Sequence, residues 1–249
     1  MKATILDNYI KSLHFPFYST IVIGSILIGV ILACIIMYRE GLKRTSIIYT
    51  AFLTFVCIMV CGLSLQIWLT GDPRRLAFTG AGGALGLLIG AFSSIFIHRD
   101  HEKEMMASWV VTAPLMYGLA KTACHISGCC VGIPYHGKWA VVYESDLISR
   151  FPVQLSESLL FTLIFLIGLF MLLISGKPLL TSRVVIVISV IAKFSMDYLR
   201  DGHYLAKSPL SQNQILALIC GVIALGLVEI VNNILGKKQV KGESKIYHG

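Results

Sequence analysis

Residues 150–177 read RFPVQLSESLLFTLIFLIGLFMLLISGK, a short polar stripe that leads directly into a long apolar run. A helix needs roughly 20 predominantly apolar residues to cross the hydrocarbon core of a bilayer. This run has that length and lacks the alternation of a half-buried β-strand. The stretch therefore predicts a transmembrane helix over residues 155–175 that enters the membrane with polar side chains near its first turn.

Other segments of the same kind flank this helix. They cover residues 20–37, 47–69, 78–97, 108–126, 184–199 and 215–235. Apolar residues make up 56% of the 249 residues and charged residues only 14%, a composition typical of membrane proteins. We therefore predict an all-α fold, a polytopic bundle of about seven transmembrane helices that forms a single integral membrane domain over residues 1–249. The first span lacks a small-residue cleavage site, so we expect an uncleaved anchor.

The formal charge of +8 would suggest a nucleic-acid partner in a soluble protein, but here it is read loop by loop. Placing the amino terminus outside gives the cytoplasmic side more Lys and Arg residues than the outer side. The clearest contrast is the short basic tail over residues 236–249. We predict the amino terminus outside, the carboxyl terminus in the cytoplasm, and no nucleic-acid partner.

Polar residues gather near one end of five predicted helices. A charged or amide side chain within a spanning helix is costly, so it usually faces the bundle interior or a water-filled cavity. Spacings of three, four and seven residues place those of one helix on one face. The residues are Gln66, Lys121, Cys124, His125, Arg150, Gln154, Glu157, Lys193, Asp197, Arg200, Ser211 and Gln214. The opposite ends carry only ordinary loop charges, which predicts a cavity open to the outer side.

Each polar group also has a structural interpretation. Lys193 and Asp197 lie one helical turn apart and could neutralise each other, and Glu157 could pair with Arg150. Arg200 lies close enough to the interface to act as a snorkelling group. The sequence leaves these interpretations open, although the coincidence of all the groups at one membrane depth favours a site.

Gly82, Gly83, Gly86 and Gly90 fall on a narrow face of the third predicted span. Small residues at four-residue spacing let helix backbones approach closely, so we expect this face to pack against another helix. The alternative is that residues 80–83 leave room for a lipid headgroup.

Residues 124–132 read CHISGCCVG and invite a metal interpretation. Adjacent cysteines do not match the usual spacing of paired zinc ligands, in which two residues separate the thiolates. We therefore expect no metal and no cofactor here. Gly128 and Gly132 instead indicate a tight return of the chain after the helix. Cys34, Cys57, Cys61 and Cys220 lie in apolar segments, where cysteine behaves as a small hydrophobe.

Three motifs together resemble one family, the bacterial prolipoprotein diacylglyceryl transferases. Residues 150–157, RFPVQLSE, are similar to its Arg-His-Pro-x-Gln-Leu-Tyr-Glu. Residues 121–132 are similar to a family signature that begins Gly-Arg and ends in glycine-bounded turns, where some members carry Gly-Cys-Cys. Residues 193–200, KFSMDYLR, resemble Arg-Phe-x-x-Glu-x-x-Arg, and residues 210–215, LSQNQI, stand in place of Leu-Ser-x-x-Gln-Ile. The resemblance covers about two thirds of the chain and implies a multi-pass protein of the bacterial cytoplasmic (inner) membrane.

The chain departs from the family pattern at four positions. Lys121 and Lys193 stand where the family has two arginines, Asp197 replaces a glutamate, and Ala81 stands where many members have a histidine. Lysine keeps the charge but loses the planar fork that holds a phosphate through two parallel hydrogen bonds.

The resemblance implies transfer of a diacylglyceryl group from phosphatidylglycerol to the lipobox cysteine of a prolipoprotein, or a closely related phospholipid-dependent transfer. The catalytic candidates are Lys121, His125, Lys193 and Asp197, with His125 the candidate base. The candidates for substrate binding are Arg150, Gln154, Glu157, Arg200, Gln214, Gly128 and Gly132. The expected partners are an anionic phospholipid and a prolipoprotein. The alternatives are a weakened paralogue that binds lipid or a lipoprotein without turnover, and a small-solute transporter, for which paired broken helices are lacking.

Overall fold

A computed structural model describes residues 2–70, 78–143, 147–202 and 209–246. In these ranges the chain forms helices α1 (Lys2–Arg39), α2 (Arg44–Thr70), α3 (Gly80–Ile97), α4 (Glu102–Ile126), α5 (Val153–Ser175), α6 (Pro178–Asp197) and α7 (Gln212–Ile246). Two short strands, β1 (Val141–Val142) and β2 (Ser149–Arg150), pair antiparallel between α4 and α5. The predicted all-helical bundle is confirmed, and each predicted span coincides with one of these helices.

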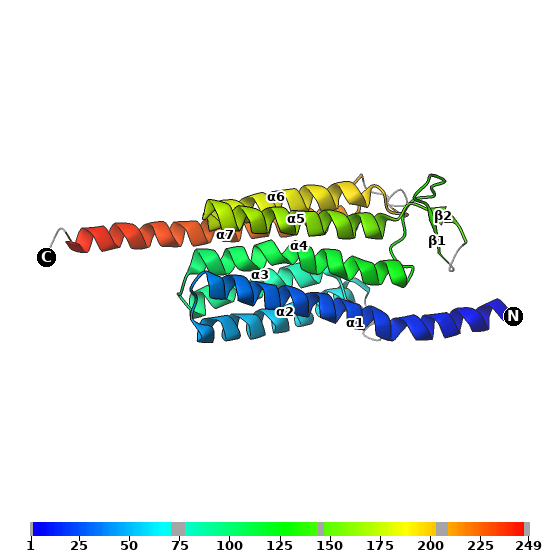
Figure 1. Cartoon of the computed structure of the whole chain (residues 1–249), viewed down its shortest axis with the longest axis horizontal. Coiled ribbons are helices and arrows are strands. Elements are labelled where there is room, and N and C mark those ends of the chain that lie inside the picture. The colour runs from blue at the N-terminus through cyan, green and yellow to red at the C-terminus, as the bar shows by residue number, and fades with distance from the viewer. Residues whose placement is uncertain (1, 71–77, 144–146, 203–208, 247–249) are drawn as a thin grey trace.

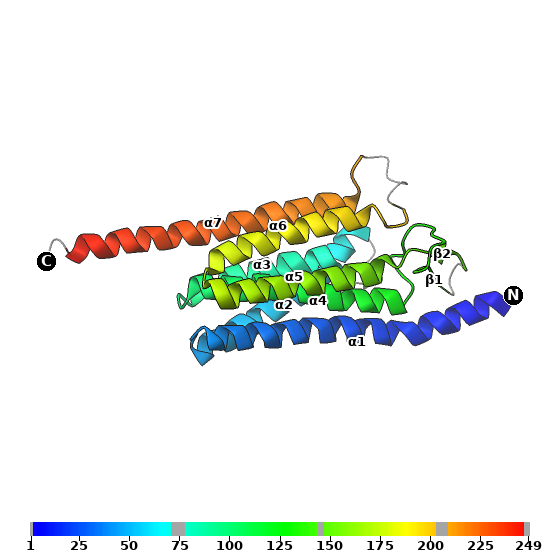
Figure 2. The same ribbon diagram turned by 45° about the horizontal axis from the view of Figure 1, so that its top comes forward.

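The helices run side by side along the long axis of the molecule (Figure 1). The amino terminus and the β1–β2 hairpin lie at one end, and the carboxyl terminus lies at the other, in both views (Figures 1 and 2). The carboxyl end of α4, the amino end of α5, the carboxyl end of α6 and the amino end of α7 therefore meet near the hairpin. We call this the hairpin end of the bundle.

Helix α4 lies at the centre of the bundle, packed against α1, α3, α5, α6 and α7. Met105, Met106 and Trp109 on this helix are fully buried. Among the described residues, the other six helices are long and apolar enough to cross a membrane by length and composition, whereas α4 is not in that set. Because five other helices surround α4, fewer of its side chains face lipid, and fewer of them need to be apolar.

Helices α2 and α3 pack most closely through the glycine face. A Cβ atom added to Gly82, Gly86 or Gly90 would overlap the backbone of α2 at Cys61, Cys57 and Thr54 respectively. The packing interpretation of this face is therefore confirmed. The close approach depends on these positions having no side chain.

At the end of the bundle opposite the hairpin, Arg183 on α6 forms an exposed ion pair with Glu229 on α7, with Nε and Oε1 2.7 Å apart. The expectation that these helix ends carry only loop charges is wrong at this position. Glu229 lies within the last predicted span, whose mean hydropathy is high despite this carboxylate.

Gly86→Ala should destabilise the protein by about 1–3 kcal/mol, because the new methyl group overlaps the Cys57 carbonyl and the helices must separate. Thermal unfolding in detergent measures the loss. Gly24→Ala on α1 is the matched control, since no atom lies within 4 Å of the added Cβ. Equal unfolding temperatures for the two variants would contradict the packing argument.

Candidate active site

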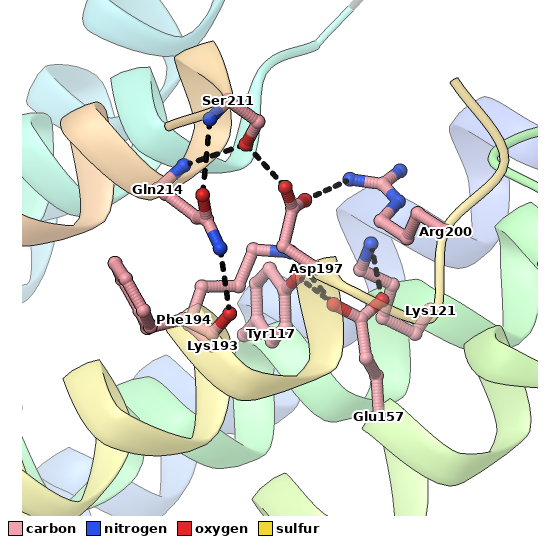
Figure 3. A network of polar contacts seen from close by, with 9 residues as sticks. All are labelled: Tyr117, Lys121, Glu157, Lys193, Phe194, Asp197, Arg200, Ser211 and Gln214. Carbon is pink, nitrogen blue, oxygen red and sulfur yellow. Dashed lines mark hydrogen bonds and ion pairs between the residues drawn. The ribbon is translucent and has the colours of Figure 1, made fainter. Parts of the chain in front are cut away.

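Glu157, in the first turns of α5, is fully buried at the hairpin end. Its Oε1 accepts hydrogen bonds from the Tyr117 hydroxyl at 2.9 Å and from Lys193 Nζ at 2.6 Å (Figure 3). Its Oε2 lies 2.7 Å from Lys121 Nζ in an ion pair. One carboxylate thus joins α4, α5 and α6. The structure thus brings Lys121, Glu157 and Lys193 together.

The ring of Tyr117 lies beside both ammonium groups. Lys121 Nζ is 5.0 Å and Lys193 Nζ is 5.4 Å from the ring centroid, within reach of a cation–π interaction. We did not predict Tyr117, which stands in an apolar segment and has the appearance of a packing residue. Its position four residues before Lys121, on the same helical face, was the available signal.

Asp197 ends α6 and connects it to the start of α7. It accepts a hydrogen bond from the Ser211 hydroxyl, and its Oδ1 lies 3.6 Å from Arg200 Nη1 (Figure 3). Ser211 and Gln214 form a capping box. The backbone N–H of Gln214 donates to Ser211 Oγ at 3.1 Å, and the backbone N–H of Ser211 donates to Gln214 Oε1 at 3.0 Å. Gln214 Nε2 also donates to the Phe194 carbonyl at 3.2 Å. The first turn of α7 therefore lies beside the last turn of α6.

The structure gives Lys193 and Arg150 different partners from those the sequence suggested. Lys193 pairs with Glu157 on the neighbouring helix, while Asp197 contacts Ser211 and Arg200. Arg150 lies in β2, before α5 begins, so helical spacing to Glu157 does not apply to it.

Arg150 connects the strand β2 to the chain that follows α6. Its Nη1 donates to the Gly132 carbonyl at 2.9 Å and to Asp201 Oδ2 at 2.6 Å. Gly132 in turn forms an antiparallel bridge with Arg200, and an added Cβ at Gly132 would overlap the Phe151 carbonyl. Gly128 has a φ of 63°, the left-handed conformation that favours glycine. The predicted tight return of the chain after α4 is confirmed.

A directed chain of hydrogen bonds ends at His125. Gln154 Nε2 donates to the Cys129 carbonyl at 2.8 Å, which leaves its Oε1 to accept from the Tyr143 hydroxyl at 2.9 Å. Because that hydroxyl donates its hydrogen to Gln154, its oxygen accepts from His125 Nδ1 at 3.0 Å. In the neutral imidazole this chain places the hydrogen on Nδ1 and leaves Nε2 with a lone pair. We had not predicted Tyr143, which lies in the segment between α4 and α5, where helical spacing does not apply.

The ion cluster has an excess of positive charge. Lys121, Lys193 and Arg200 face the two carboxylates of Glu157 and Asp197. The side chain of Lys193 is 17% exposed and that of Arg200 is 13% exposed, whereas Glu157 is fully buried. Lys193 and Arg200 thus form the more accessible part of the cluster, an arrangement that suits an anionic ligand. Of the predicted polar residues, Gln66 lies outside those whose side chains the structure describes.

The fold and the site define a polytopic helical membrane protein with a buried, cationic polar cluster at one end of its bundle. Residues 8–230 match the family described as prolipoprotein diacylglyceryl transferase, and the chain belongs to this family of bacterial inner-membrane transferases. It is 33% identical over 90 residues to the phosphatidylglycerol–prolipoprotein diacylglyceryl transferase of Chloroherpeton thalassium. That match covers 34% of this chain and 32% of the relative. The resemblance found in the sequence is confirmed.

Glu157→Gln should destabilise the protein by about 3–5 kcal/mol, because it leaves the buried Lys121 ammonium and the partly buried Lys193 ammonium without their shared carboxylate. Thermal unfolding in detergent, monitored as the loss of soluble protein on heating, measures this change. The control is Glu229→Gln, which breaks the exposed pair with Arg183 and should cost less than about 1 kcal/mol. Similar losses in the two variants would show that burial does not set the energy of the Glu157 cluster.

Proposed function

We propose that this protein transfers a diacylglyceryl group from phosphatidylglycerol to the lipobox cysteine thiol of a prolipoprotein. The observation that carries the proposal is the excess positive charge that Lys121, Lys193 and Arg200 bring to the hairpin end. Family membership supports a transferase, and the printed name of the Chloroherpeton relative supports phosphatidylglycerol as donor. A phosphate diester needs cationic groups to hold it and to stabilise the charge that grows on the leaving phosphate.

In this reaction the thiol sulfur forms a bond to the carbon of the acylated glycerol that carries the phosphate. The bond from that carbon to the phosphate oxygen breaks. The thiol proton passes to a base, and glycerol phosphate leaves with the electron pair of the broken bond. The ammonium groups of Lys121 and Lys193 and the guanidinium of Arg200 stabilise the departing phosphate. Asp197 holds Arg200 in place from α6.

His125 is the base in this proposal, with Nε2 as the accepting atom. Tyr143 and Gln154 are positioning residues, because their hydrogen bonds fix the tautomer and orientation of the imidazole. Ala81 stands where many members of the family have a histidine, and His125 is the imidazole that lies on the Lys121 face of α4. Arg150, Gly128 and Gly132 act through the backbone around the site, and Gln214 acts through the start of α7.

We also propose that the hairpin end faces the outside of the cytoplasmic membrane, with the carboxyl terminus in the cytoplasm. The amino terminus and the site lie at the same end of the bundle (Figure 1). The basic residues after Leu235 favour the cytoplasm. This orientation presents the cluster to lipids of the outer leaflet.

Lys121→Gln and Lys193→Gln, made singly, should each lower transfer at least tenfold, or about 1.4 kcal/mol, because each removes one cation from the donor phosphate. Each variant keeps one lysine on Glu157, so folding should persist. Mass spectrometry of a lipobox peptide incubated with phosphatidylglycerol micelles measures the product. Arginine at either position should maintain or raise the rate, since its fork holds phosphate through two hydrogen bonds.

Arg183→Gln, at the opposite end of the bundle, is the control for these lysine variants and should keep full activity. Full activity in both lysine variants would remove the physical basis of the donor site. Lipid binding without product in the unmodified protein would favour the weakened paralogue instead.

His125→Ala should lower kcat by about a hundredfold or more, the contribution expected of a general base. Tyr143→Phe should lower kcat by a smaller factor and leave KM for the lipid unchanged, because it removes only the orienting hydroxyl. In the unmodified protein the rate should fall on acidification, since protonated imidazole cannot accept a proton. Tyr135→Phe, in the same segment, is the matched control, and equal kcat values for the two tyrosine variants would contradict the orienting role.

A further inference from the structure

Three cysteines that the proposed transfer does not use converge at the end of α4. The sulfur atoms of Cys124, Cys129 and Cys130 all lie within 4.8 Å of one another. Cys124 is buried, Cys129 is partly buried and Cys130 is exposed, so the group extends from the protein interior to its surface.

The backbone folds back tightly to bring these sulfurs together. Gly128 has a φ of 63° and Cys130 a φ of 58°, and the Cys129 amide donates to the Cys124 carbonyl at 3.1 Å. A residue other than glycine rarely adopts the left-handed backbone conformation. Such a conformation persists where the surrounding structure requires it. Cys130 adopts that conformation here, and its sulfur lies within 4.8 Å of the other two.

We propose that Cys124, Cys129 and Cys130 form a three-thiolate site for a d10 cation with high affinity for thiolate, Zn²⁺ or Cu⁺. Sulfur atoms that surround one zinc ion at about 2.3 Å stand about 3.8–4.0 Å apart. The observed sulfurs, all within 4.8 Å of one another, are at most about 1 Å farther apart than in such a site. The exposed side of Cys130 gives the ion a route from solvent and leaves a further coordination position open.

Charges around the sulfurs favour an anionic thiolate cluster. Three thiolates outweigh the charge of either cation, and Arg200 and Lys121 both interact electrostatically with Cys130. The Ser127 hydroxyl donates to Cys129 Sγ at 3.3 Å, an outer hydrogen bond of the kind that orients metal ligands. The surplus negative charge of the loaded site therefore has partners within the protein.

The bound ion would clamp the end of α4 to the segment that follows it. That segment includes the Cys129 carbonyl, which accepts from Gln154 and so begins the hydrogen-bond chain to His125. The sequence predicted no metal because the adjacent pair lacks ordinary ligand spacing. The fold adds Cys124, five residues earlier, and that spacing rule does not describe a set built by a tight turn.

The full-length protein, purified in detergent with reductant and without chelator, is incubated with Zn²⁺ or, anaerobically, with Cu⁺. After removal of excess ion, elemental mass spectrometry should find one ion per chain for at least one metal. Cys124→Ser, Cys129→Ser and Cys130→Ser should each weaken binding at least about tenfold. Cys220→Ser on α7 is the matched control and should bind as the unmodified protein does.

Thiol alkylation of the unmodified protein provides a second measurement that does not depend on the folding of any variant. The bound ion should protect Cys129 and Cys130 from maleimide, and a chelator should reverse the protection. Absence of both metals, equal labelling with and without metal, or a disulfide among the three in protein isolated without reductant would overturn the proposal. The test does not use transfer activity, so its outcome is independent of the proposed function.

Discussion

The shared carboxylate of Glu157 is the interaction on which the hairpin end of the bundle depends. A buried charge in a membrane protein needs a partner, and here one carboxylate serves two lysines and a tyrosine from α4 and α6. Because all three elements must meet at that point, the ends of α4, α5 and α6 are fixed relative to one another. The capping box of α7 then adds the fourth helix through Asp197.

The replacement of two family arginines by lysines has a structural counterpart in this cluster. An ammonium is a compact point charge with three donors, and it can direct one donor to a carboxylate and lie beside a ring at the same time. Lys121 and Lys193 both do this around Tyr117 and Glu157. The cluster therefore retains cationic groups that reach it from two helices without the planar geometry that a guanidinium would require.

The loop between α4 and α5 organises the other half of the site. Arg150 holds this loop against the chain after α6, and Gln154 holds it against α5. This loop contacts His125 and the three cysteines in different ways. A side-chain hydrogen bond with Tyr143 orients His125, and the backbone turn over residues 128–130 brings the three sulfurs together. Helices α4, α5 and α6 thus carry Lys121, Glu157 and Lys193, and the loop carries Tyr143, Cys129 and Cys130, which contact the end of α4.

The sequence by itself determined the helical membrane fold, the family, and the gathering of Lys121, Glu157, Lys193 and Asp197 at one end. Helix length, hydropathy and three- or four-residue spacing are local properties, so they can be read from one segment at a time. Only the tertiary structure decided which charges pair, because Lys193 reaches Glu157 across 36 residues. Tyr143 and the cysteine cluster depend on how the loop folds back onto α4 and α5, and no helical periodicity encodes that contact.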